Sequence, residues 1–214
     1  MTTAVYVDCD GTLLTLAGSY ADLFATACDR VGVEADPGPL SATYSERFFE
    51  AFEAFAPDPY LSGVDAAFDH HGVEADSELF AEALVDAEVE ATVVDEGASE
   101  ALERLAADAS LGVLTNGVAD LQRRKLEHHG LFERFDAYLP SYEVGSHKPS
   151  PEIFEAARER LDAEGYVYVG DSMESDIRPA RDAGFLPVHL DRTSEAGAVT
   201  VDGLSTLGRT AELF

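Results

Sequence analysis

The stretch "VYVDCDGTLL", residues 5–14, decides the interpretation of the fold. A β-branched and aromatic run ends in two aspartates, Asp8 and Asp10, and then continues into Gly11 and Thr12. Aspartate is depleted within strands, and a buried carboxylate is costly unless it is paired or bound to a metal. This pattern predicts a buried strand that ends at a functional loop.

The composition limits the class of protein. A chain of 214 residues with 46% hydrophobic content can bury one substantial core, or one core plus an inserted domain. No apolar run reaches the length of a membrane span, and the N-terminus lacks the features of a signal peptide, so we expect a cytoplasmic protein. Cys9 and Cys28 are too few for a disulfide framework and lack a zinc-ligand spacing, so we expect two free thiols.

The formal net charge of −28 comes from 42 acidic and 14 basic residues. Such a charge repels nucleic acid and anionic membranes, so we expect neither of them as a partner. The acidic residues are interleaved with regularly spaced apolar residues, which argues against disorder. The pattern is typical of proteins from cells with molar internal salt, where the Debye length is about 3 Å and self-repulsion is screened. We therefore expect a halophilic protein.

The order of elements predicts an α/β fold. A strand at residues 4–7 is followed by helical spacing over 16–31, 40–55, 59–71 and 76–91, with no evident internal repeat. Beyond these helices, strands expected at 111–114, 137–139, 166–169 and 187–190 alternate with helices expected at 99–107, 118–129, 151–161 and 175–183. Alternation of this kind is typical of a parallel sheet covered on both faces. We predict a Rossmann-like parallel-sheet core, residues 1–14 and 92–214, with an α-helical domain, residues 15–91, inserted after the first strand.

Polar residues follow each of the first four predicted strands of this core. Open parallel sheets bind ligands beyond the carboxyl ends of their strands. Each residue taken alone is typical of a turn or a helix cap, but together they indicate a single site. The residues are Asp8, Asp10, Gly11 and Thr12 after the first strand, Thr115 and Asn116 after the second, Lys148 after the third, and Asp171 and Asp176 after the fourth.

Four segments resemble, in order and spacing, the motifs of the haloacid dehalogenase-like hydrolase superfamily. They are "DCDGT" from residue 8, "TN" from 115, Lys148 in "HKP", and "GDSMESD" from 170. The resemblance covers the whole chain and implies that the helical insertion is the all-helical cap of that superfamily. It also implies a Mg²⁺ site formed by Asp8, the backbone carbonyl of Asp10, and Asp171.

Phosphoryl transfer needs a nucleophile, neutralisation of the phosphoryl oxygens, and a proton for the leaving group. Asp8 is the candidate nucleophile, and Asp10, on the same side of an extended chain, is the candidate acid and base. A cluster of carboxylates needs a cation, and an all-oxygen site suits Mg²⁺. The predicted substrate-binding residues are Thr12, Thr115, Asn116, Lys148 and Asp176, of which Asp176 holds Lys148 in place. Lys148 is one of only two lysines, which favours a specific role for it.

We expect a Mg²⁺-dependent phosphatase acting on a small phosphorylated metabolite, similar to phosphoglycolate phosphatases or nucleotidases. A phosphosugar mutase stays open, because it uses the same motifs and differs in the phosphoryl acceptor. A 2-haloacid dehalogenase is less favoured, since those members of the family carry an aromatic residue where this chain has Asp10. A non-enzymatic phospho-switch is disfavoured by the long helical insertion. The sequence leaves open the substrate, the oligomeric state, and whether Arg47 contacts a second anionic group on the substrate.

Overall fold

The computed structural model describes residues 2–191 and 199–207. The chain divides into two compact units, one made of Met1–Thr15 and Val93–Phe214 and the other of Leu16–Thr92. Within the described residues, no helix combines the length and the apolar character that crossing a membrane requires.

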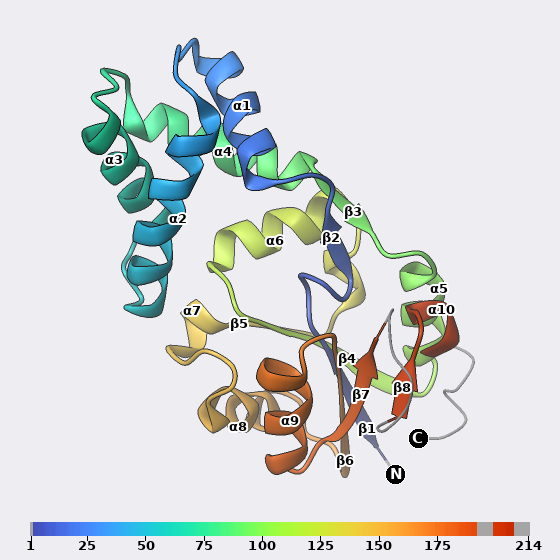
Figure 1. The fold of residues 1–214 in the computed structure, drawn as a ribbon. Coiled ribbons are helices and arrows are strands. Elements are labelled where there is room, and N and C mark those ends of the chain that lie inside the picture. Colours follow the sequence, from blue (N-terminus) through green and yellow to red (C-terminus); the bar gives the residue numbers. More distant parts are fainter. Residues whose placement is uncertain (1, 192–198, 208–214) are drawn as a thin grey trace. The chain divides into compact units, whose positions relative to one another are not determined.

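The first unit contains a six-stranded sheet in the order β5-β4-β1-β6-β7-β8, in which every neighbouring pair is parallel (Figure 1). Its strands are β1 (Thr3–Val7), β4 (Ala109–Thr115), β5 (Ala137–Pro140), β6 (Gly165–Gly170), β7 (Leu186–Leu190) and β8 (Val199–Val201). The predicted α/β fold with a parallel sheet is confirmed. Because β1 lies between β4 and β6, the strand order reverses at β1, and ligand sites form at such a switch point.

Alternation along β1 places its side chains on two separate cores. Val5 and Val7 pack in a cluster with residues of α5, α6 and α10, whereas Ala4 and Tyr6 pack with residues of α8 and α9. Because both faces of β1 are buried, its sequence is a continuous apolar run instead of an alternation of apolar and polar residues. The α-helices that the structure describes in this unit are α5 (Ala98–Leu105), α6 (Ala119–His128), α7 (Ser141–Val144), α8 (Pro151–Arg160), α9 (Arg178–Asp182) and α10 (Leu204–Leu207).

Some elements of this unit differ from the prediction. The single helix expected over residues 175–183 is instead a π-helical turn, Met173–Ile177, followed by α9. The hydroxyl of Ser172 accepts the backbone N–H of Ser175 at 3.1 Å and caps this turn. Strand β8 and helix α10 were not predicted, because elements of three and four residues are too short to show a period.

A two-stranded sheet, β2 (Leu14–Leu16) with β3 (Thr92–Val94), was also not predicted. The helical spacing assigned from residue 16 is wrong at its start, because α1 (Tyr20–Val31) begins only after Ser19. Ser19 and Asp22 form a capping box, and this local hydrogen bonding sets the helix start. The pairing of β2 with a distant three-residue strand leaves no local sequence signal.

The second unit is a bundle of four helices, α1, α2 (Pro37–Glu53), α3 (Pro59–His71) and α4 (Ser77–Glu90). Its interior is largely aromatic: the ring centroid of Phe24 lies 5.0 Å from that of Tyr44 and 5.5 Å from that of Phe80. Phe68 lies 4.9 Å from Phe80 in the same core. Edge-on and tilted ring packing of this kind stabilises the bundle beyond the burial of area alone.

The pentapeptide "GVEAD" begins at Gly32 and again at Gly72, so the prediction of no internal repeat is wrong. Gly32 and Gly72 end α1 and α3 with positive φ angles of 72° and 65°, a conformation that glycine adopts without strain. Asp36 and Asp76 then accept backbone N–H groups at the starts of α2 and α4. The repeat therefore encodes two copies of the same helix stop and start.

Candidate active site

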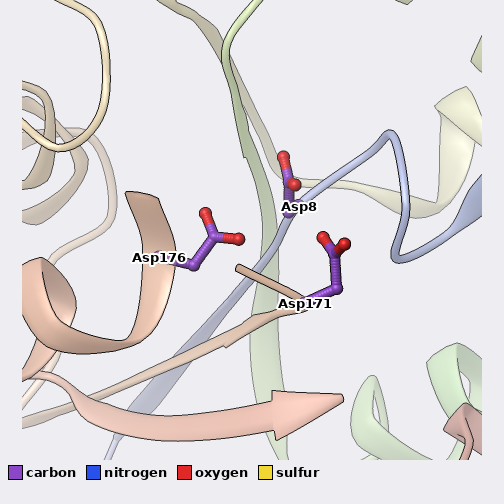
Figure 2. Close-up of side chains that lie close together, drawn as sticks. All are labelled: Asp8, Asp171 and Asp176. Carbon is purple, nitrogen blue, oxygen red and sulfur yellow. The ribbon is translucent and has the colours of Figure 1, made fainter. Parts of the chain in front are cut away.

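Three carboxylates converge at the carboxyl ends of β1 and β6. Asp8 follows β1, and its backbone N–H donates to the carbonyl of Val169 in β6 at 2.9 Å. Asp171 follows β6, and Asp176 lies in the π-helical turn. One oxygen from each of the three carboxylates lies within 4.8 Å of the others, and Figure 2 shows the side chains approaching one another from these elements.

Lys148 lies between two of these carboxylates. Its Nζ is 2.8 Å from Oδ1 of Asp8 and 2.6 Å from Oδ1 of Asp176, and its side chain is only 3% exposed. Nζ also donates to the hydroxyl of Tyr168 at 2.9 Å. That hydroxyl lies 3.0 Å from the carbonyl oxygen of Leu114 and 3.1 Å from Asp176 Oδ1. The ammonium is therefore fixed in position and faces Asp8.

The electrostatics of this cluster are dominated by burial. Burial raises the pKa of Asp8 to about 7, with Lys148 opposing the shift and Asp176 adding to it. Burial alone would lower the pKa of Lys148, but the carboxylates of Asp8 and Asp176 raise it overall. The pKa of Asp171 is raised by burial and by Asp176. A bound cation would favour the ionised carboxylates, and carboxylate oxygens suit Mg²⁺, so the donor set fits that metal.

The loop after β1 is shaped around Asp171. Gly11 has a φ of 81°, and a Cβ atom there would lie 2.5 Å from Oδ2 of Asp171. Only glycine therefore allows this approach. The hydroxyl of Thr12, which is fully buried, donates to Oδ1 of Asp171 at 3.3 Å. The sequence predicted Thr12 as a substrate-binding residue; the structure places it against a predicted metal ligand.

Asn116 holds the loop that carries Lys148 in place through two hydrogen bonds. Its Oδ1 accepts the backbone N–H of Lys148 at 2.8 Å, and its Nδ2 donates to the carbonyl of Lys148 at 2.9 Å. Thr115, the last residue of β4, is 1% exposed. The predicted donation from Thr115 and Asn116 to a phosphoryl group stays a prediction, whereas the positioning contact of Asn116 is observed.

The side chain of Asp10 contacts α6, whereas those of Asp8, Asp171 and Asp176 approach one another. Gln122 and Lys125 of this helix donate to its carboxylate. Sequence reasoning missed both residues and also missed Tyr168. A signal for Lys125 was available, because the chain has only two lysines. A tyrosine within a strand carries no comparable signal for Tyr168, since aromatic residues are common in strands.

Both arginines of the helical unit are engaged in ion pairs within that unit. Nη2 of Arg30 lies 2.5 Å from Glu90, and Nη1 of Arg47 lies 2.6 Å from Glu50. The pair formed by Arg47 is exposed and lies within a single helix, α2. Contact between Arg47 and a second anionic group of a substrate stays a prediction, and such contact would compete with Glu50.

Comparison with known proteins identifies similar hydrolases. A family model described as haloacid dehalogenase-like hydrolase matches residues 2–184. Pyrimidine 5′-nucleotidase YjjG of Escherichia coli is 38% identical over 113 residues, which are 51% of this chain and 50% of that protein. Phosphoserine phosphatase of Thermus thermophilus is 45% identical over 85 residues, 39% of this chain and 34% of that protein. The chain thus spans half or less of the length of these relatives.

Two solved structures share the fold over nearly their whole length. The HAD-hydrolase YfnB of Bacillus subtilis, solved with magnesium bound, has a TM-score of 0.77 at 22% identity, covering 99% of each chain. L-2-haloacid dehalogenase of Xanthobacter autotrophicus has a TM-score of 0.72 at 18% identity, also covering 99% of each chain. At these identities the similarity establishes the fold alone.

Proposed function

We propose that this chain, which belongs to the haloacid dehalogenase-like hydrolase family, is a Mg²⁺-dependent phosphatase that cleaves a small phosphorylated metabolite through an aspartyl-phosphate on Asp8. Relatives named as a phosphatase and a nucleotidase support this reaction class. The observation that carries the proposal is the pair of aspartates after β1. One is buried beside an ammonium, 2.8 Å from Lys148 Nζ, and the other, Asp10, has a side chain that is 48% exposed.

In the proposed first step, a carboxylate oxygen of Asp8 attacks phosphorus, and the bond from phosphorus to the ester oxygen breaks. Lys148 favours the ionised form of Asp8. During the transfer its ammonium would also neutralise charge on the phosphoryl oxygens. A Mg²⁺ ion held by Asp8, the backbone carbonyl of Asp10, and Asp171 would add positive charge at the same oxygens. The proposed chemistry therefore places the reacting phosphoryl group beside Lys148.

Asp10 has the proposed role of moving protons in both steps. In the first step its protonated carboxyl gives a proton to the departing alkoxide, which leaves as the free alcohol. In the second step its carboxylate takes a proton from the water that attacks phosphorus. Inorganic phosphate then leaves, and Asp8 returns to a free carboxylate. Atoms and protons balance over the two steps, and the net reaction is hydrolysis of the ester.

Of two other reactions of the family, dehalogenation is disfavoured and phosphosugar mutation stays open. Dehalogenases share the fold, but cleavage of a carbon–halogen bond needs no acid for the departing halide, so Asp10 favours a phosphate ester. A phosphosugar mutase would use the same residues, with a sugar hydroxyl in place of water. Detection of a sugar bisphosphate intermediate would identify the mutase.

The proposed function is tested by a screen for product release. The protein is incubated with a panel of phosphorylated metabolites and with 2-chloropropionate, each with Mg²⁺ or with EDTA. We expect phosphate release from at least one ester, loss of that activity by about 100-fold or more in EDTA, and recovery when Mg²⁺ is restored. Chloride release without phosphate release from any ester would contradict the proposal.

The charge of the chain predicts an unusual salt dependence. Residues 15–91 contain 17 acidic and two basic residues, within a chain of formal charge −28, so the long-range field opposes entry of a phosphate dianion. Raising KCl from about 0.1 M to about 1 M shortens the screening length from about 10 Å to about 3 Å. We therefore expect kcat/KM and the thermal midpoint to rise together with KCl.

The salt prediction is measured by titrating KCl at saturating Mg²⁺, with folding followed separately by circular dichroism. A phosphatase that attracts its substrate through a basic cleft should lose kcat/KM over the same range, which makes such an enzyme a useful reference. Activity that is maximal near 0.1 M KCl and falls steadily above it would contradict both the unfavourable field and the halophilic interpretation.

A further inference from the structure

Both carboxylate oxygens of Asp10 are held by one face of α6. Nε2 of Gln122 donates to Oδ2 at 2.6 Å. Nζ of Lys125, three residues further along the helix, donates to Oδ1 at 3.1 Å and lies 3.4 Å from Oδ2. Residues three apart on a helix point in nearly the same direction, so the two side chains act on Asp10 together.

The burial of Lys125 makes a simple surface ion pair an insufficient explanation. Its side chain is 4% exposed, although Asp10, its partner, is 48% exposed. Lysine is almost never fully buried unless it is paired, because removing an ammonium from water is costly. The chain contains only one other lysine, Lys148, which pairs with Asp8. Each of the two lysines thus contacts one of the two aspartates that follow β1.

The buried position of the Gln122 side-chain amide is also energetically unfavourable. Its side chain is buried, and among the described residues its Oε1 has no hydrogen-bond partner. Its Nε2 donates to the carbonyl of Asn116 at 3.2 Å as well as to Asp10. A Cβ atom on Gly117 would lie 2.4 Å from this nitrogen, so glycine is needed for the amide to reach its position. A buried acceptor without a partner is unfavourable, which indicates that the contacts of Nε2 determine where the amide lies.

We infer that Lys125 and Gln122 are positioning residues that hold the carboxyl group of Asp10 for its proton transfers, an inference that rests on the proposed phosphatase function. Asp10 lies in a loop with its side chain half exposed, where a free carboxylate would populate several rotamers. A proton donor is effective only within hydrogen-bond reach of the departing oxygen, so restricting it to one orientation favours the reaction. The helix α6 supplies that restriction through two side chains, and each carboxylate oxygen has two lone pairs, so the transferred proton can bind beside these hydrogen bonds.

The inference is tested with Lys125→Met, which removes the ammonium and keeps a long unbranched side chain. The quantity measured is kcat/KM, which reports the step in which the leaving group departs. For an alkyl phosphate with a poor leaving group we expect a loss of about 10- to 100-fold, below the full value of general acid catalysis. For p-nitrophenyl phosphate, whose leaving group needs no proton, we expect a change of less than about threefold. Lys125→Arg, which restores a cation, should recover part of the loss.

A matched control lies on the same helix. Arg123→Met also removes one positive charge, but Arg123 forms an exposed ion pair with Glu127 at 2.7 Å and does not contact Asp10. We expect Arg123→Met to leave kcat/KM unchanged for both the alkyl phosphate and p-nitrophenyl phosphate. Circular dichroism and the Mg²⁺ dissociation constant, measured by calorimetry for each variant, separate the positioning effect from a loss of folding or of metal.

A double-mutant cycle with Asp10→Asn distinguishes action through Asp10 from any other effect. In the Asp10→Asn background, Lys125→Met should cause no further loss of kcat/KM beyond about twofold. Losses that multiply, equal losses on alkyl and aryl esters, or a gain in activity would overturn the inference. If Asp10→Asn itself shows no dependence on the leaving group, the proposed function fails instead. Should Lys125→Met not fold, Gln122→Met in the same cycle must show the same selective and non-multiplicative loss.

Discussion

Replacement of Asp8 by Asn is expected to reduce turnover by at least about 10⁴-fold while the protein remains folded, because the change removes the nucleophilic carboxylate at nearly constant shape. Burial raises the pKa of Asp8, and Lys148 has a second carboxylate partner, Asp176, which the change leaves in place. The measurement is kcat at saturating substrate and Mg²⁺, with folding followed by circular dichroism.

A matched control for this change is Asp182→Asn, which neutralises an exposed carboxylate that pairs with Arg181 at 3.2 Å. This control should turn over at the rate of the parent protein. If the Asp8→Asn variant retains activity within about tenfold of the parent, covalent catalysis by Asp8 is wrong.

Replacement of Asp10 by Asn is expected to lower kcat/KM for alkyl phosphates by about 10² to 10⁴, the usual value of general acid catalysis. Aryl phosphates should be much less affected, because their leaving groups depart without a proton. The measurement is a series of esters graded by the pKa of the leaving group. Equal losses along the whole series would remove Asp10 from the acid role.

The part of the site that follows from strand topology could be predicted from the sequence. Asp8, Lys148, Asp171 and Asp176 each come shortly after a predicted strand, and parallel strands end at the same edge of a sheet. The structure brings these four residues together, with Lys148 in contact with both Asp8 and Asp176. The α/β fold was predictable for the same reason, since alternating strands and helices have few other arrangements.

The contacts that could not be predicted depend on side-chain direction within helices and strands. Nothing in the spacing of α6 says that the face bearing Gln122 and Lys125 points at Asp10, because an apolar helix face and a functional one share the same period. Tyr168 is similar, since the alternation of β6 does not indicate that this hydroxyl contacts Lys148, which lies in a loop 20 residues earlier in the chain. The repeat beginning at Gly32 and Gly72 is different, because the two copies of "GVEAD" are visible in the sequence itself.

A covalent phosphoryl group on Asp8 can be detected by trapping the intermediate. The Asp10→Asn variant is mixed with an aryl phosphate labelled in its phosphoryl group and quenched in acid at increasing times, and the labelled peptide is mapped by mass spectrometry. We expect up to about one label per chain on Asp8, released by hydroxylamine as is typical of an acyl phosphate. Phosphate release without any label on the protein, or label on a residue other than Asp8, would contradict a covalent intermediate on Asp8.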